Sequence, residues 1–417
     1  MGTLFLFLSV SAFGAAWDNK IWVSSLTFLE SGLPASKGTE NNFNTTSNFL
    51  FLSSSAMFTQ ALGAEGIFAA GQFYYSDGIQ SENTTDFSVN KLAAVFKTGG
   101  VLLKAGRIFY GSQNTLLPYY GLYDNYYDAV SSALDGGYGS VNLGKYFDIN
   151  AVYGKETKSV FSAGDGTLAG AVLSFRPTAG LELSPFIFDY RRTDYNVMLK
   201  SDLLLYGGSL DFNINGRSNF YISYAANGGS GKYYGNSVYG ADENYGGGAL
   251  LVKFNTENEK HGIYYNLRFL YLNCAGRNKD NLSFTGIHPY IYLGSIFTGT
   301  DLLRRVGAAS TFERPYAGSA DNINAYNIGA TLSPAFAGFI KFDFDIYSYS
   351  SIVSYLPNKD IGSEIDAGLT VTPFKNLSLS AVYAQFYPGQ GFKNQFNPLY
   401  FDVGNITQLM FKAVLKF

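Results

Sequence analysis

Apolar and polar residues alternate along most of the chain with a period of two. The stretch "FIKFDFDIY" at 339–347 separates into two sets, with Ile340, Phe342, Phe344 and Ile346 against Lys341, Asp343 and Asp345. The stretches "FDINAVYG" at 147–154 and "EIDAGLTV" at 364–371 alternate in the same way. Successive side chains of a β-strand point to opposite faces, so these stretches predict strands with one apolar and one charged face.

The whole chain divides into about eighteen such segments, most of them near the 9 to 11 residues that a tilted membrane-spanning strand needs. Short and long connections alternate between them. The short ones read as tight turns at 97–100, 144–146, 177–180, 215–218, 256–260, 334–338 and 373–376. The long ones are polar and lie at 32–45, 79–85, 110–135, 158–166, 192–199, 228–245, 274–321, 350–359 and 389–403. This order predicts an all-β fold: a transmembrane antiparallel β-barrel with short periplasmic turns and long extracellular loops.

The composition supports this fold class. Charged residues make up 15% of the 417 residues, against about 25% in ordinary soluble domains, while aromatic residues reach 17%. The mean hydropathy is near zero, and no apolar run reaches the roughly 20 residues of a spanning helix. A large soluble β-protein, such as a propeller or a β-helix, is the alternative. The net charge of −3 indicates no nucleic-acid partner, and the single Cys274 excludes an internal disulfide framework.

The two ends of the chain carry further signals. An apolar stretch at 4–10, followed by small residues, predicts a signal peptide over 1–16 that lacks a basic start. Residues 17–417 then form a single barrel domain. In the final stretch "ITQLMFKAVLKF", Phe417, Leu415, Ala413, Phe411 and Leu409 share one face, which we expect to point to lipid. We expect Lys412 and Lys416 to face the lumen, and Trp17, Trp22 and Phe417 to form a periplasmic aromatic girdle.

The strand number, the loop order and the C-terminal "KAVLKF" resemble the eighteen-stranded porins of the OprD type and the major porins of the epsilon class of proteobacteria. The stretch "LLKAGRIFYGSQNTLLPYYGLYDNYYDAV" at 102–130 resembles the strand of such porins that precedes a loop folded into the barrel. The resemblance implies an outer-membrane channel. The chain departs from the OprD type because it has no dense run of arginines, so specificity for carboxylate substrates is not implied.

The connection at 110–135 is the best candidate for a constriction, because an inward loop narrows a lumen and its charges set ion preference. It contributes Tyr120, Tyr123, Asp124 and Asp128. An aromatic girdle at the outer interface is the alternative for these tyrosines. Alternation assigns further residues to the lumen: Asp189, Arg191, Asp211, Lys253, Arg268, Lys341, Asp343 and Asp345. Arg107 also belongs there if a bulge near Gly106 corrects its phase.

These features predict a porin of the bacterial outer membrane that passes small hydrophilic solutes and ions by passive diffusion. A substrate-selective channel and a barrel-anchored adhesin are the alternatives. An enzyme is disfavoured, since the only histidines, His261 and His288, belong to a turn and to a distant loop. We expect no cofactor and no metal site, and lipid, solutes and ions as partners. A homotrimer is an option that the sequence does not decide.

Overall fold

The structure is a computed structural model. It describes residues 16–32, 35–36, 43–76, 81–122, 133–157, 166–194, 199–233, 242–274, 284, 286–287, 291–297, 323–351, 358–396, 401–402 and 404–417. The predicted signal peptide falls outside these residues except for Ala16, where the first strand begins. The calls on residues 1–15 therefore stay predictions.

One antiparallel sheet of 19 strands dominates the described part of the chain. Its first half consists of β1 (Ala16–Ser31), β3 (Phe43–Met57), β4 (Leu62–Ser76), β5 (Ser81–Thr98), β6 (Val101–Ile108), β7 (Leu134–Asn142), β8 (Phe147–Glu156), β9 (Thr167–Thr178) and β10 (Leu181–Asp194). Its second half consists of β11 (Leu199–Asn213), β12 (Ser218–Tyr233), β13 (Asp242–Tyr245), β14 (Gly248–Lys260), β15 (Ile263–Cys274), β16 (Ile323–Pro334), β17 (Ile340–Ser351), β18 (Asp360–Phe374), β19 (Leu377–Pro388) and β21 (Ile406–Lys416). The short β13 only extends the pairing at the end of β12, so eighteen strands form the wall, as predicted.

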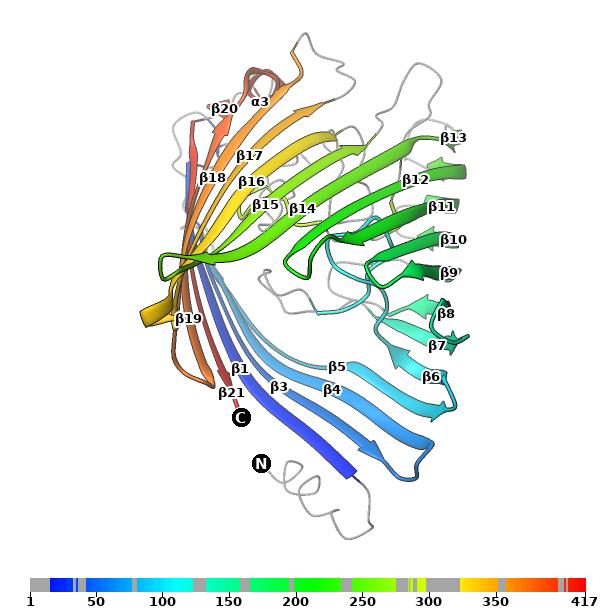
Figure 1. Ribbon diagram of the computed structural model, residues 1–417. Helices are drawn as coiled ribbons and strands as arrows, with labels where there is room; N and C mark the ends of the chain where they lie inside the picture. Colours follow the sequence, from blue (N-terminus) through cyan, green and yellow to red (C-terminus); the bar gives the residue numbers. More distant parts are fainter. Residues whose placement is uncertain are drawn as a thin grey trace.

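The sheet closes on itself, because β1 pairs with β3 on one side and with β21 on the other. Trp22, for example, lies opposite both Phe51 and Lys416. Two backbone hydrogen bonds between Ile21 and Phe417, of 3.3 and 2.7 Å, extend the seam to the last residue. Figure 1 shows β1 and β21 side by side at this seam. Closure leaves no unpaired strand edge, which a wall in lipid requires.

The apolar face of the wall points outward. On β17, Phe342, Phe344 and Ile346 are 49%, 47% and 45% exposed, whereas the alternate residues Asp343 and Asp345 lie inside and are ion-paired with Arg268. On β21, Leu409 and Phe411 are exposed while Gln408 and Met410 are buried inside. The predicted faces are therefore confirmed for Leu409, Phe411 and Lys412, whereas Phe417, at the end of the strand, lines the inner cavity instead of the lipid face. An apolar exterior around a polar interior is the arrangement of a barrel whose outer solvent is lipid.

The connections alternate in length as predicted. Turns at 58–61, 99–100, 143–146, 179–180, 214–217, 261–262, 335–339 and 375–376 link consecutive strands at one end of the barrel. The predicted turn at 256–260 belongs to β14, and His261 with Gly262 makes the turn instead. Much of the predicted connections 79–85 and 228–245 is also strand. Both faces of these extensions are polar, so their alternation of apolar and polar residues is lost.

Small elements lie between the strands. A 3₁₀-helix, η3 (Ala335–Ala337), sits in the turn between β16 and β17. Helix α3 (Gln390–Phe396) and the two-stranded pair of β2 (Ala35–Ser36) with β20 (Phe401–Asp402) belong to the long connections. In Figure 1, α3 and β20 lie at the end of the barrel opposite the C-terminus. None of the helices in the described residues is long and apolar enough to cross a membrane.

Two segments enter the barrel and create an apolar core inside it. The first follows β6 and contributes Leu116 and Tyr120; the second lies at 291–297 and contributes Phe297. They pack against inward residues of the wall such as Phe188 and Tyr349, which are at most 1% exposed. The interior of this barrel is therefore part core and part polar lumen.

Candidate functional site

The segment 109–122 folds from the end of β6 into the barrel. Tyr110 and Tyr120 exchange two backbone hydrogen bonds of 2.8 and 2.7 Å, which fold the segment into a closed loop. Leu116 and Tyr120 of this loop, and Ile108 just before it, are at most 1% exposed. The prediction that this connection enters the barrel is confirmed for its described part.

A buried carboxylate anchors this loop to the wall. The hydroxyl of Tyr120 donates to Oε1 of Glu156 at 2.7 Å, and the hydroxyl of Tyr190 donates to Oε2 at 3.1 Å. Glu156 is 6% exposed and stands on the inner face of β8. Hydrogen bonds to a charged acceptor are about twice as strong as neutral ones, so this pair holds the loop firmly in place.

The tip of the loop reaches the far side of the interior. Lys253 on β14 donates from Nζ to the backbone carbonyl of Asn114 at 2.8 Å. The side-chain oxygen of Asn114 accepts from the backbone N–H of Tyr292 at 2.8 Å, in the second inserted segment. Asn114 has a φ of +56°, a conformation that asparagine tolerates better than most residues. The two inserted segments thus meet inside the barrel and narrow it.

Two carboxylates of β18 hold the second inserted segment. Glu364 accepts from the backbone N–H groups of Ile296 and Phe297 at 2.7 and 2.9 Å. Asp366 accepts from the N–H of Ser295 at 2.9 Å. The ring of Phe297 stacks on Tyr349 with centroids 4.0 Å apart. The sequence analysis predicts only a long polar loop here, although the apolar run "IYLGSIF" at 291–297 is a signal for a buried position.

Charged groups of opposite sign form networks on two sections of the inner wall. On β15 and β17, Arg268 binds Asp345 at 2.8 Å, contacts Asp343 at 3.6 Å and donates to Thr331. On β4 to β6, the carboxylate of Glu65 forms ion pairs with Lys91 and Lys104, with both Nζ atoms 2.9 Å from Oε1. These networks keep the wall hydrated and rigid without a large excess of either sign.

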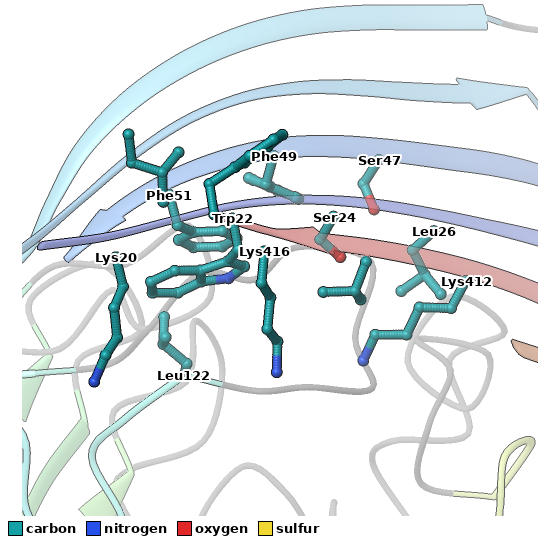
Figure 2. A pocket seen from close by; sticks show the side chains of 13 residues that line it. Lys20, Trp22, Ser24, Leu26, Ser47, Phe49, Phe51, Leu122, Lys412 and Lys416 are labelled. Carbon is teal, nitrogen blue, oxygen red and sulfur yellow. The ribbon is translucent and has the colours of Figure 1, made fainter. Parts of the chain in front are cut away.

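A cavity of about 470 Å³ opens beside the barrel seam, between β1, β3 and β21 and the end of the first inserted segment. Trp22, Phe49 and Phe51 line it, with Trp22 stacked on Phe51 at 4.9 Å between ring centroids. Lys20, Lys412 and Lys416 line it too. Figure 2 shows their side chains extending from the strands to the same side as the ring of Trp22, with Leu122 facing that ring.

Trp22 therefore does not belong to the predicted outer girdle. Trp17 and Trp22 are five residues apart on one strand, so the alternation of β1 sends them to opposite faces. Trp17 stays on the outer face, where its ring makes an edge contact with Phe58. The sequence analysis does not assign Lys20 and Trp22 to the lumen. The signal for them is their spacing of two residues from Ser24 and Leu26, which places all four side chains on the same face of β1.

Most of the predicted lumen residues lie inside the barrel. They are Tyr120 in the inserted segment and Asp211, Lys253, Arg268, Lys341, Asp343 and Asp345 on the inner faces of β11, β14, β15 and β17. Tyr123, Asp124 and Asp128 lie outside the described residues. That any of these side chains governs permeation stays a prediction.

Asp189 and Arg191 face outward, contrary to the prediction. They alternate with Phe188 and Tyr190, which are buried inside against the inserted segment. Phe188 contacts Tyr110 there, with ring centroids 6.0 Å apart. The rule that apolar residues face lipid fails on this strand, because the inserted loop supplies an apolar environment inside the barrel.

Arg107 also faces outward, because the predicted bulge is absent. Gly106 has a φ of +127°, but β6 pairs without a register shift with both β5 and β7. Arg107 therefore shares the face of its partner Leu92, which is 53% exposed. Lys104 remains inside.

Among the described residues, no group of three or more histidine, cysteine or acidic side chains is arranged to hold a metal ion.

The fold has clear counterparts among solved structures. OccAB2 of Acinetobacter baumannii superposes with a TM-score of 0.59 at 12% identity, over 96% of this chain and 98% of that one. OpdQ of Pseudomonas aeruginosa gives 0.56 at 12% identity, over 96% and 97%. OccK5 (OpdH) of the same species gives 0.55 at 12% identity, over 96% and 98%. At this identity the likeness shows the fold alone. No family model and no curated protein matches the sequence.

Proposed function

We propose that this protein is a channel of the bacterial outer membrane through which small hydrophilic solutes and ions diffuse passively. The observation that carries the proposal is the polarity of the two faces of the wall. The exterior is apolar, whereas the interior is lined by charged side chains, among them Lys91, Glu65, Arg268 and Asp345. Such a wall is stable only with lipid outside and water inside. The solved structures with this fold bear the Occ and Opd names of the OprD-type group that the sequence resembles.

The inserted segments give the proposed channel its constriction. Because Asn114 bonds both Lys253 and Tyr292, the first segment spans part of the lumen rather than lying along one wall. A narrowed passage lined by fixed charges discriminates among ions by sign and size. An adhesin would need only the barrel as an anchor and would gain nothing from a closed bridge across its interior.

A substrate-selective channel is the second candidate, and the cavity at the seam favours it. Stacked rings beside three lysines offer an apolar platform and positive charge to a solute that combines a flat ring with an anionic group. A cavity of about 470 Å³ lies within the range of small-molecule sites.

The narrower resemblance to porins of the epsilon class and a trimeric assembly are further proposals. No catalysis is part of the proposal.

Conductance measurements test the channel. Purified protein in planar bilayers should give discrete current steps, whereas a pure anchor would give none. Trp22→Ala should weaken block of the current by an aromatic anion such as benzoate by about three- to tenfold, because it removes the stacking platform. Trp17→Ala is the matched control, since Trp17 lies on the same strand but on the outer face. Equal effects of the two variants would exclude the selective site and leave the general channel.

A further inference from the structure

The cavity at the seam carries aromatic rings on one side and ammonium groups on the other. Three cross-strand rows of the inner wall line it, and successive rows are two residues apart along each strand. From β3 through β1 to β21, the rows are Phe51, Trp22 and Lys416, then Phe49, Ser24 and Val414, then Ser47, Leu26 and Lys412. The rings therefore come from β3 and β1, whereas two of the three lysines come from β21.

The rings form a platform against the wall. The ring of Trp22 stacks on Phe51 at an interplanar angle of 12°, and the ring centroids of Phe49 and Phe51 are 5.7 Å apart. Gly71 lies opposite Phe49 on β4, and a Cβ atom there would clash with the ring of Phe49. Trp22 and Phe49 are only half-buried, and Leu122 faces the ring of Trp22 from the inserted segment (Figure 2). The platform therefore offers aromatic surface on which a flat ring can stack.

Positive charge predominates among the described groups at this cavity. Three lysines line it, and none of the described lining residues is acidic. The acidic residues nearest in the strand register are Asp18 and Glu65, in one cross-strand row. Asp18 is paired with Lys20 at 3.1 Å, and Glu65 is paired with two lysines of its own sector. Three lysines and the one carboxylate of Asp18 give these groups a net charge of +2.

The kind of basic side chain favours a phosphate over a carboxylate. The planar fork of an arginine matches the two oxygens of a carboxylate, but no arginine is among the described lining residues. A lysine ammonium is a point charge with three donors, and several such groups can surround one oxyanion. Ser24 and Ser47 add hydroxyl groups between the ring side and the lysine side. Separate donors of this kind suit the three terminal oxygens of a phosphate monoester.

We propose that the cavity binds a phosphate monoester that carries a flat ring, such as an aryl phosphate or a nucleoside monophosphate. This inference rests on the proposed channel function and gives the solute of the selective site a chemical class. The ring stacks on Trp22, and the dianionic phosphate lies at Lys416, directly opposite on β21. Coulomb attraction scales with the product of the charges, so a second negative charge on the ester doubles the attraction to each lysine.

Two esters of the same shape test the preference for a dianion. Phenyl phosphate carries a charge of about −2 at pH 7.5, whereas phenyl sulfate carries a single charge. In planar bilayers at 0.1 M salt, phenyl phosphate should block the current at a concentration about tenfold lower than phenyl sulfate. Inorganic phosphate, which has the charge without the ring, should block more weakly than phenyl phosphate. Equal block by the two esters, or by inorganic phosphate and phenyl phosphate, would overturn the proposal.

A change of pH alters the charge of the ligand without a mutation. The second pKa of a phosphate monoester is about 6, so phenyl phosphate is a monoanion at pH 5. Its block should weaken there by about tenfold relative to phenyl sulfate, whose charge is the same at both pH values. None of the described lining residues is a histidine, and the sulfate ester corrects for any change in the protein. A ratio of the two esters that is the same at pH 5 and 7.5 would contradict the proposal.

Two variants divide the site into its charged and its aromatic part. Lys416→Gln should lower the preference for phenyl phosphate over phenyl sulfate to about threefold or less, because it removes the ammonium group opposite Trp22. Lys375→Gln, in the turn after β18, is the matched control and should keep the wild-type preference. Trp22→Ala should weaken block by both esters by the same factor of about three to ten. A preference that Lys416→Gln does not change would reject this site for the phosphate.

A binding measurement separates failure of the site from failure of the channel. The chain has two tryptophans, so in a Trp17→Phe variant the fluorescence of folded barrels in detergent reports on Trp22. Phenyl phosphate should change this fluorescence saturably. Discrete current steps without block and without a fluorescence change would reject the site while the channel stands. A saturable change in a protein that gives no current steps would reject the channel while the site stands.

Discussion

At the scale of single residues, the alternation of side chains along a strand decides whether a residue faces lipid or the lumen. Phe411 is 47% exposed on the outer face of β21, and Val414, three residues on, lines the cavity inside. Met410 also faces inward, but it is buried in a cluster with Leu26 and Phe28. A lysine is therefore tolerated on the inner face only where open space remains.

We predict that Phe411→Lys destabilises the folded barrel by about 2–4 kcal/mol, because it places a charge against lipid near mid-membrane. Val414→Lys should change stability little, since its ammonium group enters the cavity beside Lys412. Urea unfolding in detergent or lipid vesicles, followed by heat-modifiable mobility, measures both. Equal losses in the two variants would show that the faces of β21 are misassigned.

At the scale of elements, a few buried acidic side chains position the two inserted segments. Glu364 receives two backbone N–H groups of the segment 291–297, and Asp366 receives a third. Each such hydrogen bond contributes about 0.5–1.5 kcal/mol net. The segment depends on these contacts, because it has no strand partners among the described residues.

Glu364→Gln should therefore loosen the segment 291–297. The amide nitrogen of glutamine cannot accept a hydrogen bond, so one of the two bonds from the backbone N–H groups of Ile296 and Phe297 is lost. The amide NH₂ and that backbone N–H, both donors, then face each other. We expect faster cleavage of this connection in limited proteolysis and a larger, noisier single-channel conductance. Asp343→Asn is the control, because Asp343 also faces inward but pairs with Arg268 and not with the segment. Unchanged proteolysis of Glu364→Gln would remove the proposed anchor.

At the scale of the whole molecule, the distribution of charge in the lumen would set the ion preference of the proposed channel. Lys20, Lys412 and Lys416 stand together at the seam, with Lys20 partly balanced by Asp18 at 3.1 Å. The three ammonium groups supply a local positive potential at this place in the lumen.

Replacing these three lysines by glutamine should shift the permeability ratio of the channel toward cations by about two- to fivefold at low salt. The change should fade at high salt, because the Debye length falls from about 10 Å at 0.1 M to about 3 Å at 1 M. Reversal potentials in a potassium chloride gradient give the ratio. Lys375→Gln, in the turn after β18, is the control for a lysine outside the lumen. A shift toward anions would contradict the assignment.

The sequence by itself determined the wall of this barrel. When lipid lies outside, an alternating stretch such as 339–347 must turn its apolar residues outward. This rule predicted the faces of β17 and β18, and of Leu409 and Phe411 on β21, correctly. Tight turns and long connections determined the strand number. These features are local, since each strand carries its own pattern and pairs with its neighbour in sequence or across the seam.

Only the tertiary structure decided what fills the interior. Asp189 and Arg191 are predicted to face the lumen because polar residues are expected inside, yet the inserted loop makes that part of the interior apolar. Contacts such as Asn114 with Lys253, or Glu364 with Ile296, join residues 139 and 68 positions apart. No period along the chain encodes such contacts, because they arise from the path that a loop takes once the wall has closed.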